Sequence, residues 1–175
     1  MSKELLIDGI SLSVTDVYKV AFAKKGDYTV KLTDVARQST MRSREFVHKI
    51  VEEGKPVYGI NTGFGALASK FIDKKDLATL QVNLIRSHCT GVGRPFSREV
   101  TRAIMLLRAN CLASGFSGVN PEIIDLILDF INHDITPVVP EKGSVGASGD
   151  LAPLSHIALA LIGEGEVVVD GKSQR

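Results

Sequence analysis

The sequence predicts a mainly α protein, with a small α+β N-terminal region containing hairpins followed by the start of a long helical bundle. Three observations predict this class. Several segments repeat apolar residues at helical spacing between start and stop signals. Strand patterns are short and lie toward the two ends of the chain. The last helix is apolar on nearly every side, so it needs more covering helices than the 175 residues supply, as in a truncated bundle.

The N-terminal stretch predicts a hairpin, a short helix and one more strand. Asp-Gly between apolar runs is a tight-turn pair, and Thr-Asp is a helix cap. In chain order, these elements are a hairpin of Leu5–Ile7 and residues 10–14 around Asp8-Gly9, a helix from Thr15-Asp16 to about Lys25, and a strand over Tyr28–Leu32.

Four helices are predicted in the middle of the chain, each bounded by a cap, a proline or a glycine. They run from Thr33-Asp34 to Gly54, from Asp76 to His88, from Ser97 to Ser114, and from Asn120-Pro121 to about His133. The first three carry one-sided apolar sets that we expect to pack inward. These sets are Phe46, Val47, Ile50 and Val51; Leu77, Leu80, Leu84 and His88; and Val100, Ile104, Leu107 and Cys111.

The C-terminal part predicts a glycine-rich loop, a helix and a hairpin. The helix runs from Asp150 to about Ile162, and Asp170-Gly171 joins the strand Glu166–Val169 to a short returning strand. We divide the chain into an N-terminal α+β and helical domain, residues 1–142, and the beginning of a central helical domain, residues 143–175.

Composition argues against several classes of function. Lys plus Arg is 21 and Asp plus Glu is 20, a balance that gives no support to nucleic-acid or membrane-surface binding. No secretory leader and no bilayer-spanning run is recognisable. Cys89 and Cys111 have no metal-ligand spacing and suggest a reducing compartment, so we expect a cytoplasmic protein without a metal.

The loop from Gly143 to Asp150 admits three interpretations. It can be a flexible connection with Asp150 capping the next helix, or a phosphate cradle, although neither P-loop nor dinucleotide spacing is present. The third interpretation is chemical. In a very tight turn the amide of Gly149 can attack the carbonyl of Ala147, and loss of that carbonyl oxygen and of the Ser148 hydroxyl as two waters then gives 4-methylidene-imidazol-5-one. The residues of the loop alone leave all three open.

Longer motifs carry a resemblance to a known family. Residues 143–156, Gly-Ser-Val-Gly-Ala-Ser-Gly-Asp-Leu-Ala-Pro-Leu-Ser-His, resemble the signature of the aromatic amino-acid ammonia-lyases, which build this prosthetic group from Ala-Ser-Gly. Further matches follow the family's order: Tyr58–Gly65, Leu80–His88 with Gly91–Gly93, Arg108–Asn110 and Gly115–Gly118. The resemblance implies an ammonia-lyase/fumarase-aspartase-like helical fold. It also implies a homotetramer whose active sites are completed by neighbouring subunits, and several hundred further residues.

The resemblance also assigns roles to individual residues. Ala147, Ser148 and Gly149 would form the electrophile, and Tyr58 would remove the β-proton. Ser87 and His88 resemble the pattern specific for histidine, which implies deamination of L-histidine to urocanate and ammonia without a metal or nucleotide. Asn61 and Gly65 would shape the tyrosine loop or contact substrate, and Gly146 and Asp150 would support ring formation.

Other outcomes remain open at this stage. The chain can belong to a phenylalanine or tyrosine ammonia-lyase or an aminomutase, or it can be a catalytically incomplete fragment. Support of the active-site residues from behind and core packing are equally good interpretations of His156, which lies one turn beyond the loop.

Overall fold

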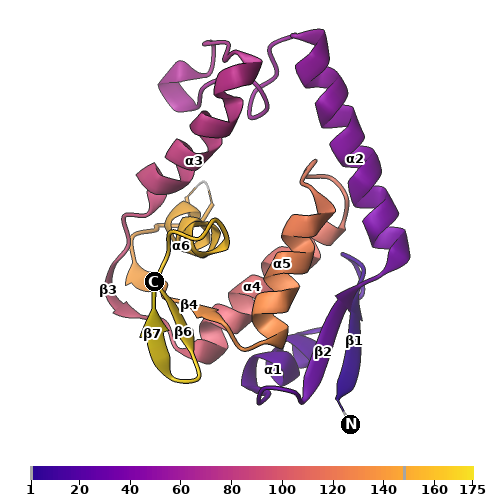
Figure 1. The fold of residues 1–175 in the computed structure, drawn as a ribbon, viewed down its shortest axis with the longest axis vertical. Coiled ribbons are helices and arrows are strands. Elements are labelled where there is room, and N and C mark those ends of the chain that lie inside the picture. The colour runs from indigo at the N-terminus through magenta and orange to yellow at the C-terminus, as the bar shows by residue number, and fades with distance from the viewer. Residues whose placement is uncertain (1, 148) are drawn as a thin grey trace.

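The computed structural model describes residues 2–147 and 149–175, and helices make up most of its regular structure, as predicted (Figure 1). The elements in chain order are β1 (Lys3–Ile7), α1 (Val14–Phe22), β2 (Tyr28–Leu32), α2 (Asp34–Glu53), the 3₁₀ turns Gly65–Leu67 and Lys74–Asp76, α3 (Leu77–His88), β3 (Val92–Pro95), α4 (Arg98–Ala113), α5 (Pro121–Asn132), β4 (Thr136–Pro137), β5 (Pro140–Lys142), α6 (Leu151–Leu161), β6 (Val167–Val169) and β7 (Lys172–Gln174).

The predicted N-terminal hairpin is wrong. β1 pairs in parallel with β2, with Ile7 opposite Leu32. Asp8 does not close a hairpin; its carboxylate accepts hydrogen bonds from the amides of Ile10 and Ser11, which turns the chain away from the strand. The amide of Gly9 then donates to the side-chain oxygen of Asn110 in α4, at 3.0 Å. Docking on α4 therefore overrides the local hairpin signal.

The helix boundaries follow their caps closely. α1 begins earlier than predicted because Ser13, not Thr15, is the cap, and it forms a reciprocal capping box with Asp16. It also ends at Phe22, before the predicted Lys25. α2 begins after Thr33, whose hydroxyl accepts from the amide of Ala36, and ends at Gly54 in the left-handed conformation, as predicted.

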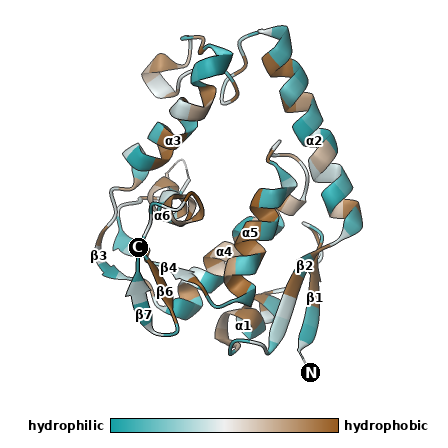
Figure 2. Cartoon of the chain, viewed as in Figure 1, coloured by the Kyte–Doolittle hydropathy of each residue, from teal (hydrophilic) through white to brown (hydrophobic). Residues whose placement is uncertain are grey.

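The hydrophobic core lies where α4 packs between α1 and α5, with β2 against α5. Figure 2 shows brown hydrophobic positions along both central helices. The fully buried apolar side chains come from all of these elements: Ile7, Val20, Val30, Met105, Leu106, Ile124 and Ile131. Because these side chains come from distant parts of the sequence, one core joins the N-terminal strands to the central helices.

The face of α4 that packs inward is not the predicted one. Met105, Leu106 and Ala109 are fully buried, whereas Leu107 is 52% exposed and Cys111 is exposed. Of the predicted set, Ile104 is partly buried against the core, but the buried face is a different one that includes the polar residues Thr101 and Arg102. The neighbouring helices thus decide which face of α4 is covered.

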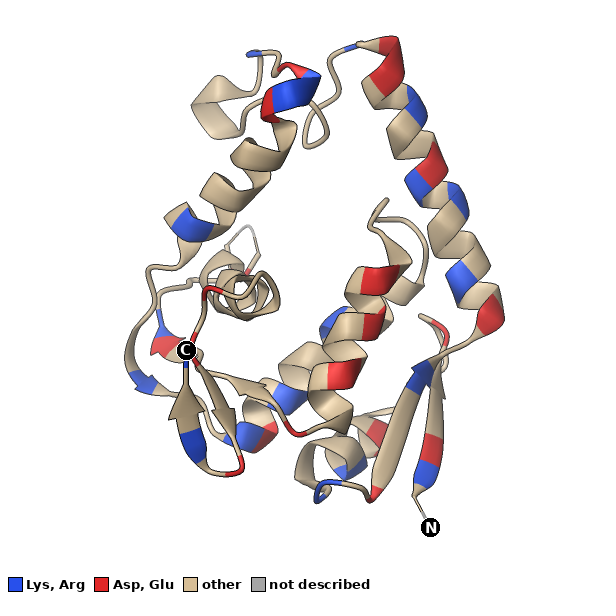
Figure 3. Ribbon diagram, viewed as in Figure 1, with Lys and Arg blue, Asp and Glu red and all other residues tan. Residues whose placement is uncertain are grey.

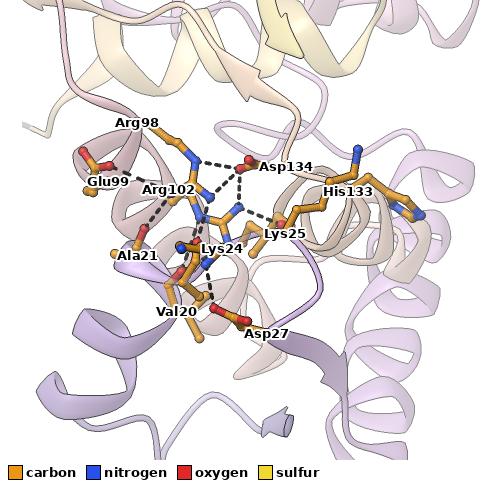
Figure 4. A network of polar contacts seen from close by, with 12 residues as sticks. Val20, Ala21, Lys24, Lys25, Asp27, Arg98, Glu99, Arg102, His133 and Asp134 are labelled. Carbon is orange, nitrogen blue, oxygen red and sulfur yellow. Dashed lines mark hydrogen bonds and ion pairs between the residues drawn. The ribbon is translucent and has the colours of Figure 1, made fainter. Parts of the chain in front are cut away.

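A buried arginine explains why that face is polar at one end. The Arg102 guanidinium donates to the carbonyl oxygens of Val20 and Ile131, and to the Asp134 carboxylate at 3.1 Å (Figure 4). Arg98 contacts the same carboxylate at 2.7 Å. Burial, and then the nearby charge of Arg98, lower the pKa of Arg102. The cluster ties α1, α4 and the end of α5 together.

Helix α2 extends from this core, α3 packs against α6, and residues 54–76 join the far ends of α2 and α3 (Figure 1). All twelve residues of α3 are described, and none of them is buried. Of the described residues of α2, only Ala36 and Thr40 are buried. The predicted packing of Phe46 is wrong, because its side chain is 64% exposed.

The C-terminal predictions are confirmed. β6 and β7 form a two-residue hairpin in which Val169 pairs with Lys172, and Asp170 and Gly171 both have positive φ. α6 packs against α3 and buries Ala152, Ile157 and Ala160, while Leu151 at its start stays 52% exposed. Among the described residues, no helix is long and apolar enough to cross a membrane.

Candidate active site

The glycine-rich loop before α6 is closed by a hydrogen bond across its base. The Ser144 hydroxyl donates to the Asp150 carboxylate at 2.9 Å. Gly146 and Gly149 have φ values of +64° and +104°, which only glycine adopts without strain. Ala147 is exposed, and Ser148 lies outside the described residues. The backbone is therefore turned at Gly146, just before the Ala-Ser-Gly segment, and at Gly149, its last residue.

Asp150 has a different role from the predicted side-chain cap. Among the described residues, its carboxylate makes no hydrogen bond to the first turn of α6. It binds Ser144 instead, a residue to which the sequence analysis assigned no function. The available signal was a hydroxyl residue and an acid at the two ends of a glycine-rich loop. Asp150 thus helps to hold the loop, and its predicted support of ring formation stays a prediction.

Ser87 and His88, at the end of α3, lie beside this loop. Both line a cavity of about 240 Å³, together with Ala147, Gly149 and other residues of the loop and of the start of α6. The cavity is smaller than the ~300–1,000 Å³ of a site for a drug-sized ligand, so its size suits a small molecule. The structure thereby brings together two of the predicted site segments, which are about sixty residues apart in the sequence.

Hydrogen bonds fix the orientation of the His88 imidazole. Its Nδ1 lies 2.9 Å from the carbonyl oxygen of Leu84 and 3.0 Å from the Ser87 hydroxyl. A carbonyl oxygen only accepts, so this network assigns the hydrogen to Nδ1. In neutral His88, Nε2 is then a hydrogen-bond acceptor. Ser87 donates its own hydrogen to Leu84, at 2.8 Å, and so helps to hold the ring.

Tyr58 is not among the described residues that line this cavity. Its side chain is 63% exposed, and its ring packs edge-on against Phe64, with 5.9 Å between the centroids. It belongs to the loop that precedes α3, whereas His88 is the last residue of that helix. A helix of this length spans about 18 Å, so the chain does not bring Tyr58 to the cavity.

Asn61 organises the tyrosine loop from inside. Its side chain is buried, with the amide nitrogen donating to Lys55 and the amide oxygen accepting from Val57. Gly65 begins a 3₁₀ turn with a φ of +55°. Both residues shape the backbone around Tyr58, which is one of the two roles that the sequence analysis considered for them.

The absence of cationic side chains limits what the described lining of the cavity can bind. The residues described there include neither lysine nor arginine, so a substrate carboxylate finds no cationic partner in this lining. Burial raises the pKa of the neighbouring Cys89 thiol, which disfavours the nucleophilic thiolate. Within residues 2–147 and 149–175, no cluster of metal-ligating side chains occurs. The lining offers the ring nitrogen acceptor of His88 beside the glycine-rich loop.

The family model described as "Aromatic amino acid lyase" matches residues 12–175 of the chain. A histidine ammonia-lyase of Caldanaerobacter subterraneus subsp. tengcongensis is 52% identical over 170 residues, which are 97% of this chain and 33% of that protein. The histidine ammonia-lyase of Bacillus subtilis is 50% identical over 167 residues, 95% of this chain and 32% of that protein. The chain therefore spans about a third of the length of the curated relatives that it matches.

Solved structures give the same result for the fold. Ergothionase from Treponema denticola superposes with a TM-score of 0.93 at 39% identity, covering 98% of this chain and 34% of that one. Histidine ammonia-lyase from Trypanosoma cruzi gives 0.89 at 38% identity, with 98% and 33% covered. Tyrosine aminomutase from Streptomyces globisporus gives 0.89 at 40% identity, with 99% and 32% covered. The structural neighbours thus include lyases and mutases of one architecture.

Proposed function

Since the chain belongs to the aromatic amino acid lyase family, we propose that it serves the non-oxidative deamination of L-histidine to urocanate and ammonia. One observation carries the choice of substrate: the imidazole acceptor of His88 lies in the same cavity as Ala147 and Gly149. The histidine ammonia-lyases at about 50% identity support the same substrate.

Family membership implies a 4-methylidene-imidazol-5-one group, which forms from Ala147, Ser148 and Gly149 in our proposal. The loop fits this chemistry, because it has positive-φ glycines directly before Ala147 and at Gly149, and it is closed by the Ser144–Asp150 hydrogen bond. When present, the group supplies an electrophile that takes the substrate amine. α6 begins directly after the loop, so the partial positive charge of its N-terminus lies next to it.

His88 recognises the substrate ring in this proposal. With its hydrogen on Nδ1, His88 presents the lone pair of Nε2 and accepts a hydrogen bond from a ring N–H. The imidazole of histidine supplies such a donor, whereas the phenyl ring of phenylalanine has none. A buried acceptor left without a donor is unfavourable, which gives discrimination between the two substrates.

Tyr58 is proposed as the base that removes the β-proton, acting in the cavity of a neighbouring subunit. It lies away from the cavity of its own chain and is exposed, so it is free to contact another copy. Asn61 and Gly65 hold its loop. A homotetramer, as the resemblance implies, would also bring the cationic partner for the substrate carboxylate. We place the protein in the cytoplasm, in keeping with its two free thiols.

The proposal is tested with the full chain by Ser148→Ala. We expect loss of the ring's ultraviolet absorbance and of urocanate formation, and an intact mass heavier by the two waters that ring closure and dehydration release, apart from the substitution itself. His88→Phe is the matched control, since it leaves the loop intact. It should keep the absorbance while shifting preference from histidine toward phenylalanine. Urocanate formation by the Ser148→Ala variant would overturn the proposal, and a β-amino acid product would identify a mutase.

A second test concerns Tyr58→Phe. We expect turnover to fall by about 10²-fold or more, as for loss of a general base, with the ring absorbance unchanged. Mixed oligomers of Tyr58→Phe and His88→Phe chains should recover part of the activity if the two side chains act in one site from different subunits. Without recovery, Tyr58 and His88 of the same chain would have to act together.

A further inference from the structure

His156 joins α6 to the segment that follows α3. It lies in the second turn of α6, and its Nε2 accepts a hydrogen bond from the amide of Gly91 at 3.2 Å. The contact is close on both sides: a Cβ added to Gly91 would lie 2.9 Å from Nε2 and 3.1 Å from Cβ of Pro140. The Gly91 backbone is therefore pressed between the imidazole and β5, where no other residue fits without movement.

Gly91 also lies between the two segments that line the cavity, the end of α3 and the glycine-rich loop. It follows His88 by three residues, so it anchors the end of α3 that carries the specificity side chains. On its other side lies Gly143, the first residue of the glycine-rich loop; a Cβ on Gly143 would be 2.9 Å from Cα of Gly91. A shift of Gly91 would thus move His88 relative to Ala147 and Gly149.

We propose that His156 is a positioning residue: by accepting the Gly91 amide hydrogen bond, it sets the distance between His88 and the Ala147–Gly149 loop. It does not line the cavity of about 240 Å³ that holds those residues, so it acts through Gly91 and not on the substrate. The effect on catalysis rests on the proposed function, whereas the hydrogen bond itself can be tested without activity.

The bond requires an unprotonated Nε2, because an amide N–H can only donate. Burial lowers the pKa of His156 and so favours that form. The charged groups around it come from the C-terminal segment: Glu164, Glu166 and Arg175 line a cavity of about 380 Å³ with His156. Glu164 is paired with Arg86 of α3. The remaining neighbours there, including Val138, Pro140 and Leu159, are uncharged.

Two substitutions separate positioning from simple packing. His156→Gln keeps an acceptor of similar reach, and His156→Leu keeps apolar volume without an acceptor. In ¹⁵N-labelled full chain, we expect the Gly91 amide to exchange with solvent about five- to tenfold faster in the leucine variant and at nearly the wild-type rate in the glutamine variant. Equal exchange rates in wild type and the leucine variant would overturn the proposal.

A titration of the wild type tests the same hydrogen bond without depending on whether the variants fold. On acidification of the wild type, the Gly91 amide shift should titrate with the same midpoint as the His156 ring nitrogens. A Gly91 amide chemical shift that does not change as His156 titrates would also overturn the proposal.

Kinetics then test the consequence for the site. We expect the leucine variant to lose histidine kcat/KM by at least about tenfold, mostly through KM, with ring absorbance retained and the glutamine variant restored toward wild type. Equal losses in the two variants would overturn the positioning role. A wild type without urocanate formation would instead overturn the proposed function, while the amide exchange still decides the role of His156.

Discussion

The core, formed by α1, α4, α5, β1 and β2, and the arms, formed by α2 and α3, are held in different ways. The core buries large apolar side chains completely, among them Met105, Leu106 and Ile124. The arms bury almost nothing: α2 carries acidic and basic residues along its length (Figure 3), and α3 has no buried residue among its twelve. The core is stabilised by buried apolar packing, whereas the arms are held mainly by polar contacts and partly buried side chains.

The candidate site belongs to the less supported side of this comparison. Its cavity lies where the end of α3 meets the loop before α6, and Tyr58 lies at the far end of the same arm. The curated relatives are about three times longer than this chain, so their additional residues are available to cover these surfaces. The residues of the candidate site thus lie on segments outside the hydrophobic core.

The largest contrast is expected from two leucines. Leu106→Ala in α4 removes a fully buried side chain and should lower the free energy of unfolding by about 2–5 kcal/mol. Leu80→Ala in α3 removes a half-buried side chain and should cost less than about 1 kcal/mol in the isolated chain. Urea denaturation followed by circular dichroism measures both. Similar losses would show that α3 is held as firmly as α4.

The buried arginine cluster gives the next largest effect. Arg102→Met removes three carbonyl hydrogen bonds and a partner of Asp134, so we expect a loss of about 3 kcal/mol. Arg98→Met is the matched control; its side chain is partly exposed, and its removal should cost about 1 kcal/mol or less. The same denaturation measurement applies. A stable Arg102→Met variant would mean that apolar packing alone joins α1 to α4.

Alanine substitutions at two glycines allow the packing at the boundary of the core, at Gly115, to be compared with that at the far end of α2, at Gly54. Gly115 and Gly54 both end helices with positive φ, +80° and +67°. At Gly54 an added Cβ meets nothing within 4 Å, so Gly54→Ala should cost only the backbone strain of about 1 kcal/mol. At Gly115 it would also lie 2.9 Å from Cβ of Ser39 in α2, so Gly115→Ala should cost more. Equal thermal stability of the two variants would contradict close packing at Gly115.

Sequence reasoning succeeded where the signal is local. Thr33 and Gly54 bound α2 as predicted, and Asp170-Gly171 forms its hairpin, because caps and two-residue turns depend on neighbouring residues alone. The same Asp-Gly pair failed at Asp8-Gly9, where the amide of Gly9 binds Asn110, about a hundred residues away. A tertiary contact of that kind leaves no local pattern to read.

In the candidate site too, sequence motifs predicted some features, and features that depend on tertiary contacts were missed. Motifs predicted that Ser87 and His88 belong with Ala147 and Gly149, and the shared cavity agrees. The helix face was wrong for α4, because a buried arginine bound to backbone carbonyls is indistinguishable in sequence from a surface arginine. Ser144 was missed because its role depends on the fold of the loop.

The smallest effect concerns the joint between α6 and the segment that follows α3, formed by the His156–Gly91 hydrogen bond. Burial lowers the pKa of His156 below its usual value near 6.5, so the unfolded chain binds the proton more tightly than the folded one. This contribution to stability is present above pH 6.5 and is lost as the pH falls through the lower folded-state pKa. Urea midpoints measured from pH 7.5 down to pH 5 should therefore fall more steeply in wild type than in His156→Gln. The difference in the pH dependence of the free energy of unfolding should correspond to at most one proton bound per molecule. Because the joint lies at the edge of the core, parallel curves would mean that α6 and Gly91 separate before the core unfolds.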